Sequence, residues 1–366
     1  MGINWNGKRV LLTGHTGFKG GWLSLWLQLQ GAELCGFSLE PPTSVNLYED
    51  AQIAQGMRSV IGDIRDGEKL RSSLAEFRPE IVFHLAAQPL VRTSYADPVG
   101  TYASNVMGTV NLLESVRCTD SVRAVVIITT DKCYENREWE WAYREIDRLG
   151  GYDPYSNSKA CAELVVSAYR NSFFHPHAYQ NHGVALASVR AGNVIGGGDW
   201  AEARLVPDIM RAFGSGESVV IRNPSAIRPW QHVLEPLRGY LTVAESLYED
   251  GSKQGEAWNF GPDPSDAQPV EWVLRELADL WGEGAKWEID RSPQVHEAQN
   301  LKLDCSKAAV RLGWRPQLRL REALSMTVDW YRAKLRGAEM RAFTCEQIRN
   351  YANLSSTNTT GGDQQA

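Results

Sequence analysis

The sequence predicts an α/β protein: a Rossmann-type, doubly wound parallel sheet with a smaller mixed α/β lobe. In the first half of the chain, short apolar runs rich in β-branched residues alternate with stretches of helical periodicity. The runs are apolar throughout, as in the strands of a parallel sheet that helices cover on both faces. A glycine-rich turn directly follows the first run, where a doubly wound sheet binds dinucleotides. At 366 residues, the chain is long enough for two coupled lobes.

The apolar runs also divide the chain. The predicted strands of the sheet are 10–12, 34–37, 59–61, 81–85, 124–129 and 184–190. After Asn193 the pattern loosens into shorter helices and strands, which include segments 206–213, 219–222, 236–248, 258–260 and 269–281. A last, amphipathic helix is predicted at 320–335. We therefore expect a dinucleotide-binding domain at 1–190, to which some later segments return, and a ligand-binding lobe at 191–345. Residues 354–366 are too polar to bury and are expected to form a disordered tail.

Charge and composition exclude several classes of partner. The net charge of −6 gives no electrostatic attraction for nucleic acid or an anionic membrane, so local arginines must bind any phosphate ligand. No apolar run reaches the length of a membrane span, and we expect no signal peptide before the first strand. The six cysteines lack metal-ligand spacing. We expect free thiols, no metal site and a cytoplasmic location.

The glycine-rich turn is the first candidate site. The segment after the first predicted strand reads Thr13-Gly14-His15-Thr16-Gly17-Phe18-Lys19-Gly20, and an amphipathic stretch follows it. In such a turn, backbone N–H groups and the dipole of the following helix converge on a pyrophosphate. A glycine-rich turn alone is common, but the strand before it and the helix after it favour a dinucleotide site. Lys19 either adds charge near the phosphates or is a solvated lysine.

The cofactor preference follows from the second predicted strand. Glu40 lies about twenty residues after the last glycine of the turn, where an acidic residue accepts the ribose hydroxyls of NAD. No arginine stands between Phe37 and Tyr48 to bind the 2′-phosphate of NADP. The sequence therefore favours NAD over NADP, although Glu40 falls slightly late for the end of its strand.

A tyrosine and a lysine follow the fifth predicted strand. Asp153 and Pro154 form a turn that would start a helix, and on a helix Tyr155 and Lys159 share a face. A tyrosine becomes a useful base only when its pKa is lowered from about 10, and a lysine ammonium one turn away would lower it. The alternative is a pair of surface side chains. Their position after a strand of the nucleotide-binding sheet favours a catalytic pair.

Three polar residues end the fifth predicted strand itself: Thr130, Asp131 and Lys132. Because ligands bind beyond the carboxyl ends of the strands in a doubly wound sheet, we expect these side chains to face the same cleft as Tyr155. An adjacent acid and amine can act as proton donor and acceptor. The alternative is a turn with an exposed salt bridge.

With these elements, the chain resembles the extended short-chain dehydrogenases/reductases that act on nucleotide sugars, and among these the 4,6-dehydratases. The resemblance runs from Trp5 to about Asn350. The segments that carry it are TGHTGFKGGWLSLWL from Thr13, FHLAAQPLVRTSY from Phe83, TTDKCYENREW from Thr129, YDPYSNSK from Tyr152, ASVRAGNVIGGGDW from Ala187, IRPWQHVLEPL from Ile227 and WNFGP from Trp258.

The resemblance implies roles for individual residues. The cofactor residues that it implies are Gly14, His15, Thr16, Gly17, Phe18, Lys19 and Gly20 around the pyrophosphate, Asp63 and Ile64 by the adenine, Leu85, Ala86 and Ala87 on the floor, and Tyr155 and Lys159 at the nicotinamide ribose. The substrate residues that it implies are Gln88, Asn193 and Arg228, with Arg291 and His296 as weaker candidates for the nucleotide end. Arg291 and His296 are equally compatible with surface groups.

One departure within the family concerns Lys132. The dTDP-glucose dehydratases carry Asp-Glu where this chain has Asp131-Lys132, and their glutamate removes the proton from sugar carbon 5. Lys132 would do so here as a neutral amine, which requires desolvation or a cationic neighbour. The substitution matches the CDP-glucose branch. The resemblance thus implies redox-neutral dehydration of CDP-glucose to CDP-4-keto-6-deoxyglucose with NAD, for deoxysugars of bacterial surface polysaccharide and O-antigen, by a homodimer or homotetramer assembled through helices 101–116 and 154–169.

Other functions stay open from the residues alone. A sugar-nucleotide 4-epimerase shares the turn and the Tyr155–Lys159 pair but has no use for Asp131 and Lys132. A dehydratase of another nucleoside diphosphate glucose is a second alternative, because residues 193–300 contain no pattern that reads as cytosine recognition. A non-catalytic NAD-sensing regulator is a third; such a protein need not keep its acid and base groups, which this chain retains.

Overall fold

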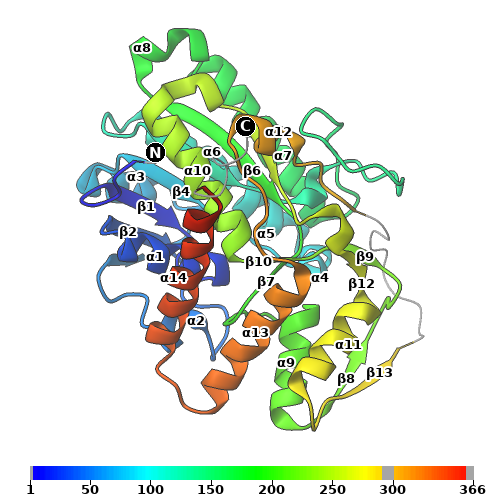
Figure 1. Ribbon diagram of the computed structural model, residues 1–366. Helices are drawn as coiled ribbons and strands as arrows, with labels where there is room; N and C mark the ends of the chain where they lie inside the picture. The colour runs from blue at the N-terminus through cyan, green and yellow to red at the C-terminus, as the bar shows by residue number, and fades with distance from the viewer. Residues whose placement is uncertain (1–2, 291–300, 360–366) are drawn as a thin grey trace, which may run out of the picture.

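A seven-stranded parallel sheet forms the centre of the protein, which we describe from a computed structural model for residues 3–290 and 301–359 (Figure 1). The strand order is β11-β6-β5-β4-β1-β2-β3. Six strands confirm the sequence prediction to within two residues at each end: β1 (Arg9–Thr13), β2 (Glu33–Ser38), β3 (Arg58–Ile61), β4 (Ile81–His84), β5 (Ala124–Ile128) and β6 (Ala185–Ala191). The prediction of a doubly wound α/β fold is confirmed.

Two elements beyond Asn193 belong to this sheet, although the sequence pattern grouped them with the smaller lobe. Strand β11 (Ala257–Phe260) pairs in parallel with β6, and helix α10 (Leu234–Asp250) packs against β5 and β6. Neighbouring parallel strands require a crossover, and α10 supplies the helix of that crossover. Both elements are thus among the later segments expected to return to the larger domain.

Helices cover both faces of the sheet because successive strand residues point to opposite sides. On one face, Leu11 and Val125 pack in a cluster with Leu70 and Leu112. On the other face, the neighbouring strand residue Leu12 packs in a second cluster with residues of α1 and α10. The helices of the first face are α3 (Gly67–Phe77), α6 (Gly108–Arg117) and α7 (Pro154–Ser172), and those of the second are α1 (Phe18–Leu29), α10 and α14 (Met340–Thr359).

The smaller elements after β6 gather below the sheet in Figure 1. They are helices α9 (Leu205–Ser215), α11 (Val270–Trp281) and α13 (Leu320–Leu335), and strand pairs β8 (Ser218–Ile221) with β13 (Lys286–Ile289), β9 (Ile227–Pro229) with β12 (Ala267–Pro269), and β7 (Val194–Ile195) with β10 (Gln231–His232). Ile209, Leu274 and Trp330 of this region belong to the same hydrophobic cluster as Leu12. A continuous core therefore joins the region to the sheet.

The C-terminal helix corrects one expectation. Residues 354–359, predicted as the start of a polar tail, are the last residues of α14, and the rest of that predicted tail lies outside the described residues. Helix α14 is anchored well before this point, because the Tyr351 hydroxyl donates to Glu235 (2.8 Å) and the Tyr351 ring meets Trp26 edge-on. The packing of the preceding turns thus stabilises α14, which extends into its polar last residues.

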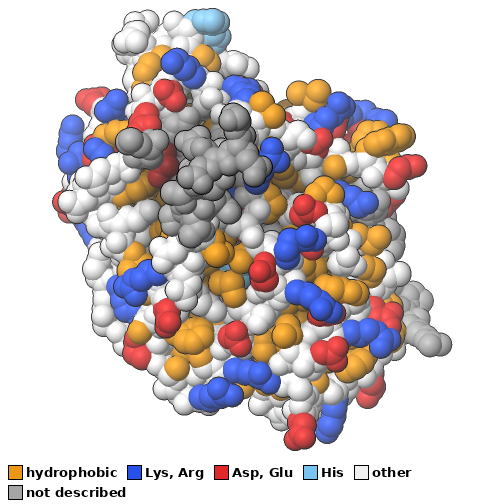
Figure 2. All heavy atoms as spheres, in the orientation of Figure 1, with side chains coloured by type: hydrophobic (Ala, Val, Ile, Leu, Met, Phe, Trp, Pro, Cys, Tyr) orange, Lys and Arg blue, Asp and Glu red, His pale blue; other side chains and the backbone are white. Residues whose placement is uncertain are grey.

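Short elements complete the described chain: α2 (Leu47–Asp50), α4 (Val91–Ala96), α5 (Pro98–Tyr102), a π-helical turn (Ala103–Met107), α8 (Tyr179–His182), α12 (Ser306–Arg311) and 3₁₀ turns at Asp131–Cys133, Pro176–Ala178, Gly251–Gln254 and Pro264–Asp266. In the described residues, we find no helix that is both long and apolar enough to cross a membrane. Basic and acidic side chains are interspersed on the face drawn in Figure 2.

Candidate active site

The glycine-rich turn forms a tight cradle at the carboxyl end of β1. Gly14 has φ +80°, and a Cβ on it would lie 2.8 Å from the backbone nitrogen of Ala86. A Cβ on Gly20 would lie 2.0 Å from the carbonyl oxygen of Gly14. Gly17 immediately precedes the first residue of α1. Side chains are thus kept away from the N-terminus of α1, and its free N–H groups can meet a dinucleotide pyrophosphate.

Thr13 and His84 fix the floor of this cradle. The Thr13 hydroxyl oxygen accepts the N–H groups of Leu85 and Ala86, both at 3.1 Å, and lies 2.7 Å from Nδ1 of His84. Nε2 of His84 lies 3.3 Å from the hydroxyl of Thr109 on α6. Burial lowers the pKa of His84 to about 3, so the ring is neutral and bridges two hydroxyls. Sequence reasoning missed His84, which lies within one of the quoted segments but carries no motif of its own.

The other predicted turn residues fall into two groups. His15 and Thr16 are buried and hold the neighbouring strands: Nε2 of His15 lies 2.7 Å from the Ser59 hydroxyl, and the Thr16 hydroxyl donates to the Leu39 carbonyl (2.8 Å). Lys19 is half-buried, and burial lowers its pKa to about 8. Of the two interpretations of Lys19, a charge near the phosphates therefore agrees with these surroundings better than a solvated lysine does.

The predicted adenine and ribose residues lie at the ends of β2 and β3. Glu40 is exposed two residues beyond β2. Asp63 accepts the guanidinium of Arg65 at 2.9 Å, and this hydrogen bond is the main reason why the pKa of Asp63 lies below its usual value. Ile64 is buried in the core under α3 and α6. Ala87 is half-buried next to the floor residues Leu85 and Ala86.

The structure brings Thr130, Asp131 and Tyr155 together at the end of β5. Thr130 precedes the 3₁₀ turn, its hydroxyl donates to Oδ1 of Asp131 (3.0 Å), and it also hydrogen-bonds the Tyr155 hydroxyl. Asp153 caps the start of α7 by accepting the N–H of Ser156 (2.9 Å). This cap fixes Tyr155 in the first turn of the helix, facing the strand end.

Asp131 has the surroundings of a proton donor. Its side chain is 1% exposed, and its Oδ2 has no hydrogen-bond partner among the described residues. Burial raises the pKa of the carboxyl above its usual value, while the charge of Lys132, the Thr130 hydrogen bond and the charge of Arg228 act in the opposite direction. A carboxyl in such a place keeps its proton to a higher pH than an exposed one. The alternative of an exposed salt bridge is excluded for Asp131.

The expected effect of Lys159 on Tyr155 is wrong. Burial raises the pKa of Tyr155 to about 12, and the neighbours that act against burial are Thr130 and Arg204. Nζ of Lys159 donates to the carbonyl of Ile128 (3.1 Å), and burial lowers its pKa to about 8. Burial of Tyr155 by the whole fold thus has a larger effect on its pKa than the charge of Lys159 one helical turn away.

The predicted substrate residues are distributed around Asp131. Arg228 on β9 is 5% exposed and close enough for its charge to lower the pKa of Asp131. Asn193 lies between β6 and β7, and its carbonyl accepts the N–H of Gln231 (3.0 Å). The side chain of Gln88 holds its own loop, because its amide donates to Thr101 (2.9 Å). Two further candidates lie outside the described residues: Arg291 and His296.

Sequence reasoning also missed Arg204, from the loop before α9. Its Nη1 donates to Oδ2 of Asp199 (2.9 Å), and its charge lowers the pKa of both Tyr155 and Lys19. Arg204 is 49 positions after Tyr155 in the chain, and no local spacing connects the two. Only the fold brings this second cation to the site.

A family model matches most of the chain, and two relatives are similar to it in sequence. The model described as GDP-mannose 4,6-dehydratase matches residues 11–327. The CDP-glucose 4,6-dehydratase of Salmonella typhimurium is 58% identical over 351 residues, which cover 96% of this chain and 98% of that enzyme. The UDP-glucose 4-epimerase of Mycolicibacterium smegmatis is 28% identical, over 89% of this chain and 99% of that enzyme.

Two solved structures are similar to this one over most of the chain. The dTDP-glucose 4,6-dehydratase DesIV of Streptomyces venezuelae, solved with NAD, has a TM-score of 0.77 at 24% identity and covers 90% of this chain and 99% of its own. The UDP-glucose 4-epimerase of Thermotoga maritima, solved with UDP-glucose, has a TM-score of 0.76 at 23% identity and covers 89% and 99%. At these identities, the two solved structures show the fold alone. The family is shown by the model match, which covers residues 11–327. The chain belongs to the GDP-mannose 4,6-dehydratase family.

Proposed function

We propose that the chain is a hydro-lyase that converts CDP-glucose to CDP-4-keto-6-deoxyglucose and water with bound NAD. The observation that carries the proposal is the environment of Asp131, a buried carboxyl with one oxygen that has no partner among the described residues. Asp131 lies next to Lys132 in the chain, and it accepts a hydrogen bond from Thr130, which also hydrogen-bonds Tyr155. The 58% identity to an enzyme named CDP-glucose 4,6-dehydratase supports the choice of substrate.

The chain has the features that NAD requires. The room left by Gly14 and Gly20 suits the pyrophosphate, and Lys19 adds a cation there. Relatives solved with NAD support this cofactor, and Glu40 stays a proposed ligand of its ribose. NAD supplies a hydride acceptor for sugar carbon 4 and a hydride donor for carbon 6. We propose that residues 1–190, with α10 and β11, bind the cofactor, and that the remaining elements of residues 191–345 bind the nucleotide sugar.

Three side chains move the protons. Tyr155 takes the proton of the carbon 4 hydroxyl as carbon 4 becomes a ketone, and the charge of Arg204 favours the ionised phenol that this step requires. The ketone acidifies the neighbouring carbon 5. Lys132 removes the carbon 5 proton, and Asp131 gives its proton to the carbon 6 hydroxyl, which leaves as water. Lys132 then returns its proton to carbon 5. The proton that Tyr155 took passes to Asp131 through solvent, which restores both groups for the next turnover.

The substrate's diphosphate needs specific cations because the chain is acidic overall. Arg228 is buried beside Asp131, and its planar fork matches phosphate oxygens. Asn193, between β6 and β7, is the second proposed diphosphate ligand. We propose that the sugar lies between Arg228 and the Thr130–Tyr155 pair.

A 4-epimerase is the main alternative. An epimerase needs Tyr155 but has no step for Asp131 or Lys132, and the epimerase relative is 28% identical against 58% for the dehydratase. The test is an incubation of the purified protein with CDP-, dTDP-, GDP- and UDP-glucose. We expect the alkali-dependent absorbance of a 4-keto product with CDP-glucose. Formation of a galactose nucleotide, or an equal rate with another base, would contradict the proposal.

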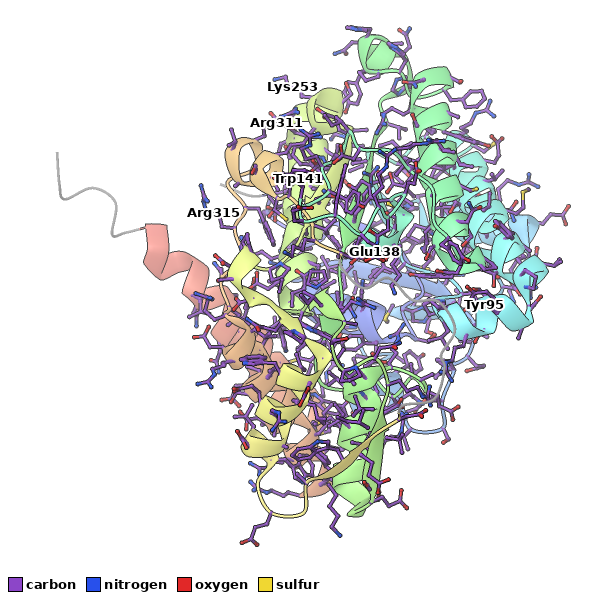
Figure 3. The ribbon with its side chains drawn as sticks, turned by 90° about the vertical axis from the view of Figure 1, so that its right-hand side faces the viewer. Tyr95, Glu138, Trp141, Lys253, Arg311 and Arg315 are labelled. Atoms are coloured by element: carbon purple, nitrogen blue, oxygen red, sulfur yellow. The ribbon has the colours of Figure 1, made fainter. Side chains whose placement is uncertain are left out.

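We also propose assembly as a homodimer or homotetramer. Val99 on α5, Met107 in the π-helical turn and Leu164 on α7 are 79%, 52% and 59% exposed. These helices lie together at the right of Figure 3, where Tyr95 marks the adjoining α4. Sedimentation of Leu164→Glu should show a smaller species than the unmodified protein if this face is the interface.

The proposed setting is the bacterial cytoplasm, at the entry to deoxysugars of surface polysaccharide such as O-antigen. All six cysteines are free thiols, which suits a reducing compartment. Deletion of the gene should remove deoxysugars from the polysaccharide, and restoration by the active protein alone would support the assignment.

A further inference from the structure

The turn that carries Asp131 and Lys132 is held by contacts that the mechanism above does not use. Thr129 lies directly after β5, at the start of the turn, and Tyr134 lies at its end. Both side chains are buried, at 4% and 1% exposed, and each carries a hydroxyl. Because buried hydroxyls are almost always hydrogen-bonded, the partners of these two show what fixes the turn.

Glu163 on α7 holds the start of the turn. The Thr129 hydroxyl donates to Oε1 of Glu163 (2.5 Å), and the Thr129 N–H donates to the carbonyl of Val189 on β6 (2.8 Å). Oε2 of Glu163 accepts the Ser188 hydroxyl (2.7 Å) and pairs with Nη2 of Arg190 (2.8 Å). Both carboxylate oxygens are thus in use, and Glu163 cannot turn away from Thr129 without breaking these bonds.

Arg190, the partner of Glu163, holds the end of the turn. Its Nη1 donates to the Tyr134 hydroxyl (2.7 Å), and that hydroxyl donates in turn to Oδ1 of Asn259 on β11 (2.8 Å). The Tyr134 ring stacks on the ring of Tyr143, with centroids 5.1 Å apart. The side chain of Tyr134 is therefore fixed both at its ring and at its hydroxyl.

The two ends of the turn thus depend on one buried ion pair, whose side chains are both 3% exposed. The backbone bonds inside the turn are longer: the N–H of Cys133 lies 3.3 Å from the carbonyl of Thr130, and that of Tyr134 lies 3.4 Å from the carbonyl of Asp131. Favourable N–H···O bonds measure about 2.7–3.2 Å. The shorter side-chain bonds at the two ends therefore determine where the turn lies.

We propose that Tyr134 is a positioning residue for the elimination step, because its hydroxyl anchors the turn that brings Asp131 and Lys132 to the sugar. The proposal rests on the proposed function, in which these two side chains act at carbons 6 and 5. A proton donor or acceptor works only within hydrogen-bond reach of its target, and a displacement of about 1 Å can lower a rate by about a hundredfold.

The step that depends on Tyr155 should be affected less. Tyr155 comes from α7, where Asp153 caps the first turn of the helix. Thr130, which hydrogen-bonds Tyr155, lies at the start of the turn, next to Thr129, and not at the end that Tyr134 anchors. Loss of the Tyr134 hydroxyl should thus slow elimination more than oxidation of carbon 4, and enzyme with bound NADH should accumulate.

The test is the variant Tyr134→Phe, which keeps the ring and removes the hydroxyl. We expect kcat with CDP-glucose to fall about tenfold, with KM within about twofold, and the absorbance of bound NADH during turnover to rise. The matched control is Tyr143→Phe. Its ring belongs to the same stack, but its hydroxyl accepts the N–H of Arg137 (2.7 Å) and donates to Asn136 (2.9 Å) in the next loop. A general loss of packing would change both variants alike, whereas the proposal predicts the rise in NADH for Tyr134→Phe alone.

A second variant tests the same anchor from its other side. Asn259→Ser removes the acceptor of the Tyr134 hydroxyl and leaves Tyr134 in place, so it also serves if Tyr134→Phe does not fold. We expect the same rise in bound NADH, with a fall in kcat of about threefold. An unchanged kcat, or a fall in kcat without more bound NADH, in the folded variants would overturn the role of Tyr134.

A further measurement needs neither substrate nor cofactor. Hydrogen exchange at the backbone amides of residues 131–134 should be at least about fivefold faster in Tyr134→Phe than in the unmodified protein, because the turn opens more easily. Tyr143→Phe should leave exchange at these amides unchanged. Equal exchange in Tyr134→Phe and the unmodified protein would overturn the anchor. Failure of the unmodified protein to turn over CDP-glucose would instead overturn the proposed function, and the exchange rates would still report whether Tyr134 fixes the turn.

Discussion

The Cα of Gly20 faces the carbonyl of Gly14 so closely that a Cβ on Gly20 would stand 2.0 Å from that oxygen. The turn after β1 and the first turn of α1 are therefore in backbone contact, and only a hydrogen atom fits between them. Gly14 in turn has φ +80°, which few residues other than glycine adopt. The shape of the proposed pyrophosphate cradle thus depends on two glycines six residues apart.

Replacement of Gly20 by alanine should break this contact. We expect Gly20→Ala to lower the unfolding temperature by several degrees and to abolish retention of NAD through purification, because the backbone must move to admit the methyl group. Gly17→Ala is the matched control, since a Cβ there would meet the Gly14 carbonyl at an ordinary 3.4 Å. Unfolding temperatures and the NAD content of the purified proteins are the measurements. Equal unfolding temperatures for the two variants would contradict the contact.

The sheet could be predicted from the sequence because its strands are buried on both faces and are therefore continuous apolar runs. A second rule, that ligands bind at the carboxyl ends of parallel strands, predicted that Thr130 and Asp131 lie beside Tyr155. The pairing of β11 with β6 could not be predicted in this way, because about 65 residues separate the two strands and no local pattern encodes which strand is the neighbour.

The electrostatics of the site could not be predicted from spacing. Lys159 stands one helical turn from Tyr155, but the pKa of Tyr155 depends on burial by the whole fold. Arg204 influences the site from a loop with no motif of its own. Sequence patterns give the residues that one element presents, whereas the shared environment of several elements requires the three-dimensional structure.

Removal of the Tyr155 hydroxyl should stop the first proton transfer. We expect Tyr155→Phe to lower turnover at least a hundredfold while leaving affinity for the nucleotide sugar within about threefold, because the ring stays and only the hydroxyl bonded to Thr130 is lost. Turnover is measured by product formation, and affinity by calorimetry. Near-normal turnover would show that Tyr155 is not the base at carbon 4.

Arg228 should act on binding more than on chemistry. A diphosphate clamp holds the ground state and the transition state alike, so Arg228→Ala should raise KM at least tenfold with a much smaller fall in kcat. Arg228→Lys should recover only part of the loss, because an ammonium lacks the planar fork. Calorimetry with CDP isolates this contact. Unchanged CDP affinity in the alanine variant would place the diphosphate elsewhere.

The buried ion pair behind the site should govern acid stability. Oε2 of Glu163 lies 2.8 Å from Nη2 of Arg190, and both side chains are 3% exposed. Burial would raise the pKa of Glu163, but the charge and hydrogen bonds of Arg190, with those of Thr129 and Ser188, lower it overall. Because the folded pKa lies below the unfolded value, the pair stabilises the fold above the unfolded pKa and loses this contribution as pH falls through the folded pKa.

Glu163→Gln should therefore lower the free energy of unfolding at pH 7 by about 3 kcal/mol, since it leaves Arg190 buried without a counter-charge. The loss should shrink below pH 4, where the unmodified protein loses the same contribution. Glu271→Gln is the control, because its pair with Arg275 lies on the surface and contributes about 0.5 kcal/mol at most. Urea unfolding across pH gives both values. A loss in Glu163→Gln that does not change with pH would contradict this account.

Lys132 separates this chain from the dehydratases that carry Asp-Glu, and its replacement should divide the reaction in two. If Lys132 removes the carbon 5 proton, Lys132→Ala should still oxidise carbon 4 and then stop. Mixing enzyme with CDP-glucose should then build the absorbance of bound NADH without release of 6-deoxy product. In deuterium oxide, the unmodified enzyme should place deuterium on carbon 5 of its product, and the variant should leave the carbon 5 hydrogen of the recovered sugar unexchanged.

Lys302→Ala, at a half-buried lysine elsewhere on the chain, is the control for a general effect of removing a lysine. Elimination of water at a normal rate in Lys132→Ala would assign the base to another group, such as a water held by Asp131.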